Sequence, residues 1–406
     1  MTPLRARPGR GRGASSAPGT GGEARASHQS SGRPVESLPT LDLLRRLTDG
    51  YVLAELVRAP ATRAALAKAT GLSKPTVSES VRRLSERGVL HEGALTQGGR
   101  GRAGTLVEVD ETAGAALAIH AGAGEVTAEV LDVRGQVRGR HTLAVDEPVR
   151  EADLQGALDA AINEAFRAAG DIAQAPLRSI AVSVADPVDP HTGRVVDLPG
   201  SPFLIGDADL PGVLRPRLAH GGRLAIDNDV NWSALAELDF GVARDLSDVI
   251  HIHLGRGIGA AIVIDGRVVQ GARGTAGEIA QLPWTGNATL VRRLSDLGLA
   301  VPGQWRLDLD LAERILRPDS TDPARDRFVE AIALACAGVV TFLDPQALIL
   351  GGPLAANDWL REAIAARVKA MCALPIDVRH AQVDEAPLSG ARRHAAADLT
   401  DLLLDA

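Results

Sequence analysis

The chain has 406 residues, a length that favours two or three domains rather than one. Hydrophobic residues make up 45% of it and charged residues 23%, a balance typical of a globular protein, which excludes a chain that is disordered throughout. No apolar run approaches membrane-spanning length, and the N-terminus lacks the apolar segment of a secretory signal, so we expect a cytoplasmic protein without a membrane partner.

The charge is divided between the front and the rear of the chain. Residues 1–110 carry 17 Lys and Arg against 10 Asp and Glu, a net charge of +7. The remaining residues carry 27 basic and 41 acidic groups, a net charge of −14. A basic front and an acidic rear are expected where only the front meets nucleic acid.

Residues 1–37 have the composition of a disordered tail. They are rich in Gly, Ser, Ala, Pro and Arg and show no hydrophobic periodicity, so they cannot bury enough apolar surface to offset the entropy of ordering. Six arginines in this segment could add weak attraction to phosphate, and a solubilising tail without a specific role is the alternative.

Residues 38–110 carry the patterns of a winged helix-turn-helix. A leucine-rich stripe predicts a first helix that runs through about Arg58. Thr62 is a good N-cap for a second helix, which we expect to end at Gly71. Ser73 is positioned to cap a third helix directly after this glycine turn.

The third helix has one apolar and one polar face. Val77, Val81 and Leu84 recur at i, i+4 and i+7 and form its predicted buried face. Two short strands follow, at residues 89–90 and 105–109, joined by a loop rich in glycine and arginine. A generic three-helix bundle with a charged face is the alternative, but it predicts neither the glycine turn between capped helices nor such a loop.

In a winged helix-turn-helix the third helix enters the major groove of DNA. Polar side chains near its start would then meet base edges, and the arginines further along would touch phosphate. The loop would form the wing, whose arginines could reach a minor groove, with a mobile hairpin tip as the alternative. The predicted DNA-binding residues are Ser73, Lys74, Thr76, Ser78, Glu79, Arg82, Arg83, Arg100 and Arg102.

From residue 111 to residue 406 the pattern is that of an α/β protein. An order of three strands, a helix, a strand and a helix appears first after residue 111 and recurs from residue 249. We therefore expect two similar lobes, with a ligand cleft where strand ends and glycine turns converge. The predicted strands cover residues 115–120, 125–133, 179–185, 224–227, 249–254, 260–264, 267–269 and 347–350, and the predicted helices cover residues 151–169, 325–343 and a segment from about Asn231.

Four motifs in this region occur in a characteristic order and spacing. They are Asp227-Asn228-Asp229-Val230-Asn231, Leu254-Gly255-Arg256-Gly257-Ile258-Gly259 followed by Asp265-Gly266, Gly274-Thr275-Ala276-Gly277-Glu278-Ile279, and Leu343-Asp344-Pro345-Gln346 leading into Leu348-Ile349-Leu350-Gly351-Gly352. With these motifs the chain resembles the ROK family, which groups repressors, open reading frames and sugar kinases. The resemblance implies an α/β fold in which the winged head precedes a two-lobed, actin-like or hexokinase-type domain. The head is similar to that of the repressor branch, the xylose and N-acetylglucosamine repressor type.

The chain departs from the family where kinases bind nucleotide. The first phosphate loop of family kinases reads Asp-x-Gly-Gly-Thr, whereas this chain has His120 at the Asp position and Gly124 at the Thr position, followed by Glu125. In the second loop Arg256 stands where kinases have Thr, which adds bulk to a cradle that needs close backbone approach. The comparison implies poor ATP binding and no catalytic residue.

The zinc site of the family is also missing from the sequence. The family continues Glu-Ile with Gly-His and a cysteine cluster, whereas this chain continues with Ala280-Gln281 and has no cysteine before Cys336. Cys336 and Cys372 both lie in apolar helical patterns, which predicts buried structural thiols. We expect neither a metal nor a cofactor.

The family's sugar-binding positions are partly kept. Asn228 and Asp229 match an Asn-Asp pair whose Asp is the general base of the kinases, and Glu278 matches the Glu that holds sugar hydroxyls. Gln281 stands at the family's His and could hydrogen-bond in its place. The alternatives are a helix N-cap or first-turn carboxylate for Asp229 and a surface carboxylate for Glu278.

The sequence thus predicts a transcriptional regulator of ROK type, a repressor rather than an enzyme, that binds a double-stranded DNA operator as a homodimer or homotetramer. A sugar or sugar phosphate held by Asn228, Asp229, Glu278 and Gln281 would change the spacing of the paired heads. One alternative is a body that has lost sensing and serves dimerisation or protein docking. The other is an active sugar kinase.

Overall fold

The computed structural model describes residues 40–95, 104–122, 124–146, 149–198, 204–205, 209–284, 288–301 and 306–405. The described residues from Asp42 onward belong to one compact unit. The predicted tail and the tip of the predicted wing therefore lie outside the described residues. Within the described ranges, no helix has the length and apolar character needed to cross a membrane.

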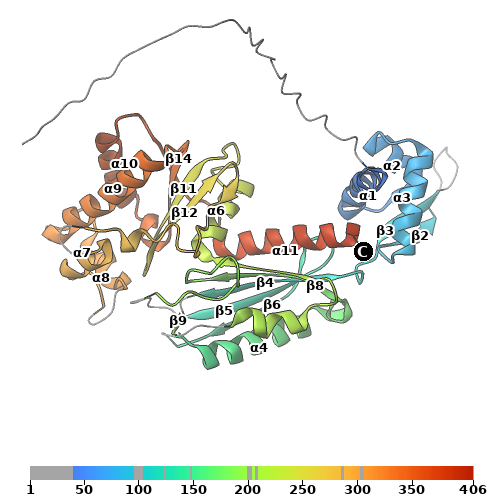
Figure 1. Ribbon diagram of the computed structural model, residues 1–406, viewed down its shortest axis with the longest axis horizontal. Coiled ribbons are helices and arrows are strands. Elements are labelled where there is room, and N and C mark those ends of the chain that lie inside the picture. Colours follow the sequence, from blue (N-terminus) through green and yellow to red (C-terminus); the bar gives the residue numbers. More distant parts are fainter. Residues whose placement is uncertain are drawn as a thin grey trace, which may run out of the picture. The chain divides into compact units, whose positions relative to one another are not determined.

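The head of the chain is a helix-turn-helix with a three-stranded antiparallel sheet (Figure 1). The strands pair in the order β1-β3-β2. The three predicted helices and two predicted strands are present, and β1 is an additional strand that the sequence did not reveal. The elements are α1 (Leu41–Arg58), β1 (Ala61–Thr62), α2 (Arg63–Thr70), α3 (Lys74–Glu86), β2 (Leu90–Leu95) and β3 (Thr105–Val109).

Capping groups set the turn between α2 and α3. The side chain of Thr62 accepts a hydrogen bond from the backbone of the first turn of α2, and Gly71 ends this helix with a left-handed φ of 71°. Ser73 then caps α3 by accepting a hydrogen bond from the backbone N–H of Thr76 at 3.3 Å. The predicted apolar face of α3, with Val77 among its residues, is fully buried in the head as a result.

The first lobe of the body has a five-stranded sheet in the order β10-β8-β4-β5-β6. Strands β4, β5 and β6 are antiparallel neighbours, whereas β8 and β10 run parallel to β4. Helices α4 and α11 cover opposite faces of this sheet (Figure 1). The elements are β4 (Ala115–Gly122), β5 (Glu125–Leu131), β6 (Val137–Ala144), α4 (Glu151–Ala168), β8 (Leu177–Val184), β10 (Arg223–Asn228) and α11 (Ala386–Asp405).

The second lobe repeats this plan with the sheet order β13-β12-β11-β14-β15. Alternate residues of β11 face different helices: Ile250 and Ile252 pack against α9, whereas Val249 packs against α6. The elements are α6 (Asp229–Asp239), β11 (Val249–Leu254), β12 (Ile258–Ile264), β13 (Arg267–Val268), α9 (Pro323–Leu343), β14 (Ala347–Gly351), α10 (Asp358–Met371) and β15 (Asp377–His380). Smaller elements are β7 (Val149–Arg150), β9 (Leu204–Ile205), α5 (Leu210–Leu214), α7 (Leu290–Asp296) and α8 (Leu309–Ile315).

The two-lobed α/β prediction is confirmed, although several elements, among them β6, α10 and β15, were not predicted from the sequence. Helix α11 comes from the end of the chain and completes the first lobe, which the sequence pattern did not reveal. Cys336 is buried in α9 as predicted, but Cys372 stands at the C-cap of α10 and is half-buried. The prediction of a fully buried thiol is therefore wrong for Cys372, because the helical pattern ends at this residue.

Candidate ligand cleft and nucleic-acid interface

A cleft between the two lobes gathers the predicted sugar-binding residues. Asn228, Asp229, Glu278 and Gln281 all line it, and so does Arg256. Strands β8 and β10 of the first lobe end at this cleft, and the loop after β11 closes it from the second lobe. Carboxyl ends of neighbouring parallel strands meet at one edge of a sheet, which is where α/β proteins hold their ligands.

Three carboxylates converge in the cleft. Burial, together with the nearby charge of Asp186, raises the pKa of both Asp229 and Glu278 to about 7. Asp186 itself is only 3% exposed. Asp186 was not predicted from the sequence, although its place two residues after the buried strand β8 is the kind of position where site residues occur.

The start of α6 fixes the first two of the predicted sugar-binding residues. The Oδ1 atom of Asn228 accepts a hydrogen bond from the backbone N–H of Val230 at 2.9 Å, so Asn228 is the N-cap of α6. Asp229 is the first residue of the helix, as its alternative interpretation required, and it also lines the cleft. The helix dipole favours a negative charge at this position, which partly offsets the cost of burying it.

A glycine loop positions Glu278 against the second lobe. Gly277 has a φ of 94°, and its carbonyl accepts a hydrogen bond from the N–H of Ala260 in β12 at 2.8 Å. A Cβ atom at Gly277 would lie 1.9 Å from the carbonyl oxygen of Ala260, so no other residue fits. The motif glycine thus has a steric role, and the carboxylate that follows it takes its place from this contact.

Two histidines stand near the ends of β4 and β11, and His253 of this pair lines the cleft. The Nδ1 atom of His120 lies 3.1 Å from Oγ of Ser183 on the neighbouring strand. Burial lowers the pKa of His120 to about 4, and burial does the same to His253 at the end of β11. Both imidazoles are therefore neutral near pH 7, so neither carries the charge that an Asp would offer a metal ion.

On the head, the predicted base-contacting residues lie at the start of α3. Lys74, Ser78 and Glu79 are exposed, whereas Thr76 is half-buried. The hydroxyl of Ser73 lies 2.7 Å from that of Thr76 and caps the helix, so it already has partners in the protein. Arg100 and Arg102 lie outside the described residues.

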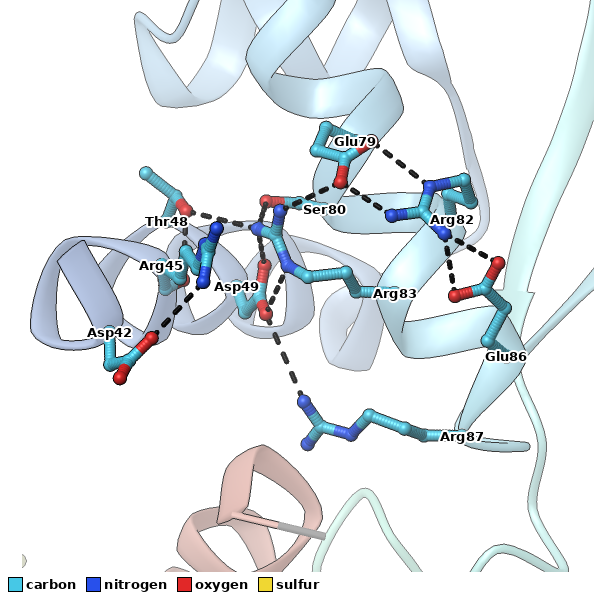
Figure 2. A network of polar contacts seen from close by, with 10 residues as sticks. All are labelled: Asp42, Arg45, Thr48, Asp49, Glu79, Ser80, Arg82, Arg83, Glu86 and Arg87. Atoms are coloured by element: carbon cyan, nitrogen blue, oxygen red, sulfur yellow. Dashed lines mark hydrogen bonds and ion pairs between the residues drawn. The ribbon is translucent and has the colours of Figure 1, made fainter.

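Two neighbouring arginines of α3 both lie within reach of Glu79, but their strongest partners differ (Figure 2). Arg82 is exposed and holds Glu79 on one side and Glu86 on the other, each at 2.6 Å. These hydrogen bonds raise the pKa of Arg82 and lower the pKa of Glu79. Glu79, Arg82 and Glu86 lie along one face of α3, so their charges largely offset one another.

Arg83 points instead toward α1 (Figure 2). Its guanidinium donates to both carboxylate oxygens of Asp49, at 2.5 and 3.2 Å, and Asp49 is only 3% exposed. This bidentate pair raises the pKa of Arg83 and links α1 to α3. The placement argues against our prediction that Arg83 touches phosphate, because its guanidinium is committed within the head.

Comparison with known proteins separates the same two regions. Residues 116–289 match the model of the ROK family, and residues 41–101 match a model of the MarR family. A putative xylose repressor of Caldicellulosiruptor sp. is 28% identical over 221 residues, 54% of either chain. The DNA-binding transcriptional dual regulator NagC of Escherichia coli is 27% identical over 246 residues, which cover 60% of this chain and 58% of NagC. The chain thus matches somewhat more than half the length of these relatives.

A solved structure supports the fold over a longer stretch. The crystal structure of a ROK family transcriptional regulator, described as a homologue of the E. coli MLC protein, superposes with a TM-score of 0.63. The alignment covers 89% of this chain and 98% of that one, at 20% sequence identity. At this identity the likeness shows a common fold.

Proposed function

Because the chain belongs to the ROK family and carries a MarR-type winged helix ahead of its ROK domain, we propose that it is a DNA-binding transcriptional repressor that senses a sugar or sugar phosphate. Its winged helix would bind a double-stranded operator in the cytoplasm. The observation that carries the proposal is the union in one chain of an exposed recognition helix and a cleft lined by Asn228, Asp229 and Glu278. The names of two relatives, a xylose repressor and the regulator NagC, agree with such a combination.

The chemistry of the cleft favours a ligand rich in hydroxyl groups. Carboxylates whose pKa is raised by burial have lost water and gain most from new hydrogen-bond donors. Vicinal hydroxyls are such donors, and an amide such as that of Gln281 adds both a donor and an acceptor. A ligand without hydroxyls would leave these buried groups unpaired, so the site would discriminate against it.

The surroundings of His120 support the proposal that the chain is not an enzyme. Phosphoryl transfer depends on a metal ion and on charge stabilisation around the transferred group. His120 occupies the position of the kinase Asp, is neutral near pH 7, and already has Ser183 as a partner. A Cβ atom at Gly122 would lie 2.4 Å from Nε2 of His120, so the ring also fills the space above the loop.

We further propose that the chain acts as a homodimer, with a dimer-based tetramer as the alternative. An apolar groove of about 1010 Å³ runs along α9 and the neighbouring strands of the second lobe. Phe342 at its edge is 91% exposed and Leu334 is 49% exposed, although both are large apolar side chains. Exposed apolar surfaces of this kind mark contacts between proteins, and a second copy would bring the second head that a palindromic operator requires.

Titration of the full chain with D-xylose, N-acetylglucosamine, D-glucose and their phosphates, followed by calorimetry, tests the sensing function. We expect saturable binding of at least one compound, weakened by roughly 10- to 100-fold in Glu278→Ala and unchanged in the matched control Glu362→Ala, whose carboxylate is exposed on α10. No binding by any compound would favour a body that serves only dimerisation or docking.

Incubation of the same samples with ATP tests the absence of catalysis. We expect no release of ADP above background. Release with one sugar that is lost in Asp229→Asn would show an active kinase.

Selection of duplexes from a random library with the purified chain tests DNA binding, and failure to enrich any sequence would contradict the head's proposed role.

A further inference from the structure

The last two turns of α11 concentrate negative charge at the wrong end of a helix. Asp398, Asp401 and Asp405 follow one another at intervals of three and four residues, so they share one face. The C-terminal end of a helix already carries partial negative charge, and within the described residues its last turn has no basic side chain of its own. Compensation has to come from other elements.

Two arginines from different parts of the chain provide this compensation. Arg223, at the start of β10, lies 3.1 Å from Asp398 and 3.4 Å from Asp405. Arg46, in α1 of the head, lies 2.7 Å from Asp405 and 3.8 Å from Asp401. Asp405 therefore joins a strand of the body to a helix of the head. We call this group of two arginines and three aspartates the α11 cluster.

Hydrogen bonds to backbone carbonyls strengthen the same junction. Arg87, which follows α3, donates to the carbonyl of Leu403 in α11. Arg134, in the turn after β5, donates to the carbonyls of Leu56 and Val57 at the end of α1, at 3.1 and 2.6 Å. These carbonyls have no partner within a helix that ends there, so the body caps the head's first helix.

Apolar packing joins the same elements. Leu399 and Leu403 of α11 belong to one buried cluster with Val52 and Leu56 of α1. Because exposed ion pairs alone contribute little, this packing supplies most of the attachment and the α11 cluster sets its geometry.

The opposite end of α11 packs on the helix that begins at the cleft. Gly390 lies so close to α6 that a Cβ atom there would stand 2.2 Å from the carbonyl oxygen of Trp232. The rings of Trp232 and His394 meet edge to face, with centroids 5.1 Å apart. Trp232 follows Asp229 by three residues, and β10 leads from Arg223 directly to Asn228. Both α6 and β10 therefore connect the cleft to α11.

We propose that α11 is the lever that couples the cleft to the DNA-binding head, with Arg46, Arg223 and Asp405 as positioning residues at its head end. A helix of 20 residues is about 30 Å long, enough to carry a shift of α6 to the head without deforming the sheet between them. This inference deepens the proposed function, since it names the element through which a sugar in the cleft would act on the head.

Hydrogen exchange of the full chain, without DNA or sugar, tests the lever. Gly390→Ala places a methyl group between α11 and α6, at the end away from the head. We expect faster exchange of α6 amides and, at the far end, roughly fivefold faster exchange of α1 amides, while β4 and β5 stay unchanged. The matched control Gly156→Ala adds a methyl group on α4, where nothing lies within 4 Å, and should leave α1 unchanged.

The α11 cluster is tested by charge replacement. Arg46→Gln and Arg223→Gln should each speed α1 exchange by roughly two- to fivefold, and the double variant should show less than the product because both arginines share Asp405. Arg292→Gln, which removes an exposed pair within α7, is the control.

Two results would overturn the lever. One is unchanged α1 exchange in Gly390→Ala while α6 exchange rises, because the wedge would then have acted without reaching the head. The other is strict multiplicativity of Arg46→Gln and Arg223→Gln, which would mean that the two arginines act separately. Since neither experiment contains a sugar or DNA, a failure here leaves the proposed function standing, and a failure of sugar binding leaves the lever standing.

Discussion

The charged side chains of the cleft and those of helix α3 lie in opposite environments. In the cleft, Asp229 and Glu278 are buried beside Asp186, and the pKa values of the first two rise to about 7 because like charges have lost water together. On α3, Arg82 lies between Glu79 and Glu86 in solvent, so each charge is paired on its own helix. The cleft holds carboxylates that burial has removed from water, whereas the charges on this part of α3 are paired in solvent.

The two regions would therefore gain different interactions from the ligands proposed for them. A sugar bound in the cleft, as proposed, would donate to carboxylates that burial has removed from water, and these hydrogen bonds would favour binding. A phosphate approaching α3 competes with two carboxylates for Arg82, so part of the binding free energy is spent on exchanging partners. Arg83 is not available for such an exchange of partners, because its ion pair with the buried Asp49 holds α1 and α3 together.

The largest effect is expected from Arg83→Ala, which leaves Asp49 buried without its bidentate partner. Breaking such a pair lowers the free energy of unfolding by about 3 kcal/mol, so hydrogen exchange of α1 and α3 in the full chain should accelerate strongly. Arg45→Ala is the matched control, because its partner Asp42 is exposed on the same helix. Equal exchange in the two variants would mean that Arg83 is no more structural than a surface residue.

The pH dependence of stability sharpens the contrast from the side of the cleft. Acids whose folded pKa is raised hold their protons in the folded state up to about pH 7 but lose them near pH 4 when unfolded. Stability should therefore fall between about pH 4 and pH 7 and then level off. Denaturant titrations should show this loss reduced by on the order of 3 kcal/mol in Asp229→Asn with Glu278→Gln. If the double variant and the unaltered chain lose the same stability between pH 4 and pH 7, the pKa values of Asp229 and Glu278 are not raised as stated.

Removal of one cleft carboxylate should weaken sugar binding by roughly 10- to 100-fold. Glu278→Ala loses charge-assisted hydrogen bonds, each worth about 1.5–3 kcal/mol, which calorimetry with whichever sugar binds will measure. The same titration repeated from pH 6 to pH 8 should show rising affinity, since only the ionised carboxylate accepts from two hydroxyls. Affinity that falls with pH would reverse the assigned protonation states.

The smallest effect is expected on α3. Arg82→Ala should weaken binding to all duplexes by roughly fivefold and lower the slope of log affinity against log salt by about 1, because one phosphate contact is lost. Lys74→Ala or Ser78→Ala should change sequence preference instead, which selection from random duplexes reveals. Arg58→Ala removes an exposed arginine at the end of α1 and is the control. An identical footprint for all these variants would contradict the docking of α3.

The sequence predicted those features that depend on local patterns. Thr62, Gly71 and Ser73 marked the turn between α2 and α3, and the family motif around Glu278 marked a residue that lines the cleft. Features that depend on contacts between distant parts of the chain were not predicted. Asp49 looked like any polar residue of a helix, and only the packing of α1 on α3 makes it the partner of Arg83.

The position of helix α11 and the burial of Asp186 also depend on contacts between distant parts of the chain. Helix α11 has mixed polar and apolar residues, and its place on the first-lobe sheet follows from contacts more than 150 residues away, such as those of Arg223 with Asp398. Asp186 lacks a motif of its own, and its burial beside Asp229 comes from the convergence of β8 and β10 at one sheet edge. Neither arrangement is visible in a single sequence.

The central claim is that the cleft holds a sugar in order to change the grip of the head on DNA. The direct test is the affinity of the full chain for a selected duplex, measured with and without each sugar of the panel and repeated with Glu278→Ala. The account predicts that one sugar shifts the affinity of the unaltered chain by at least roughly fivefold, as expected for a coupling of about 1 kcal/mol, and that Glu278→Ala no longer responds. Duplex affinity that is the same with every sugar, or a shift that persists in Glu278→Ala, would contradict it.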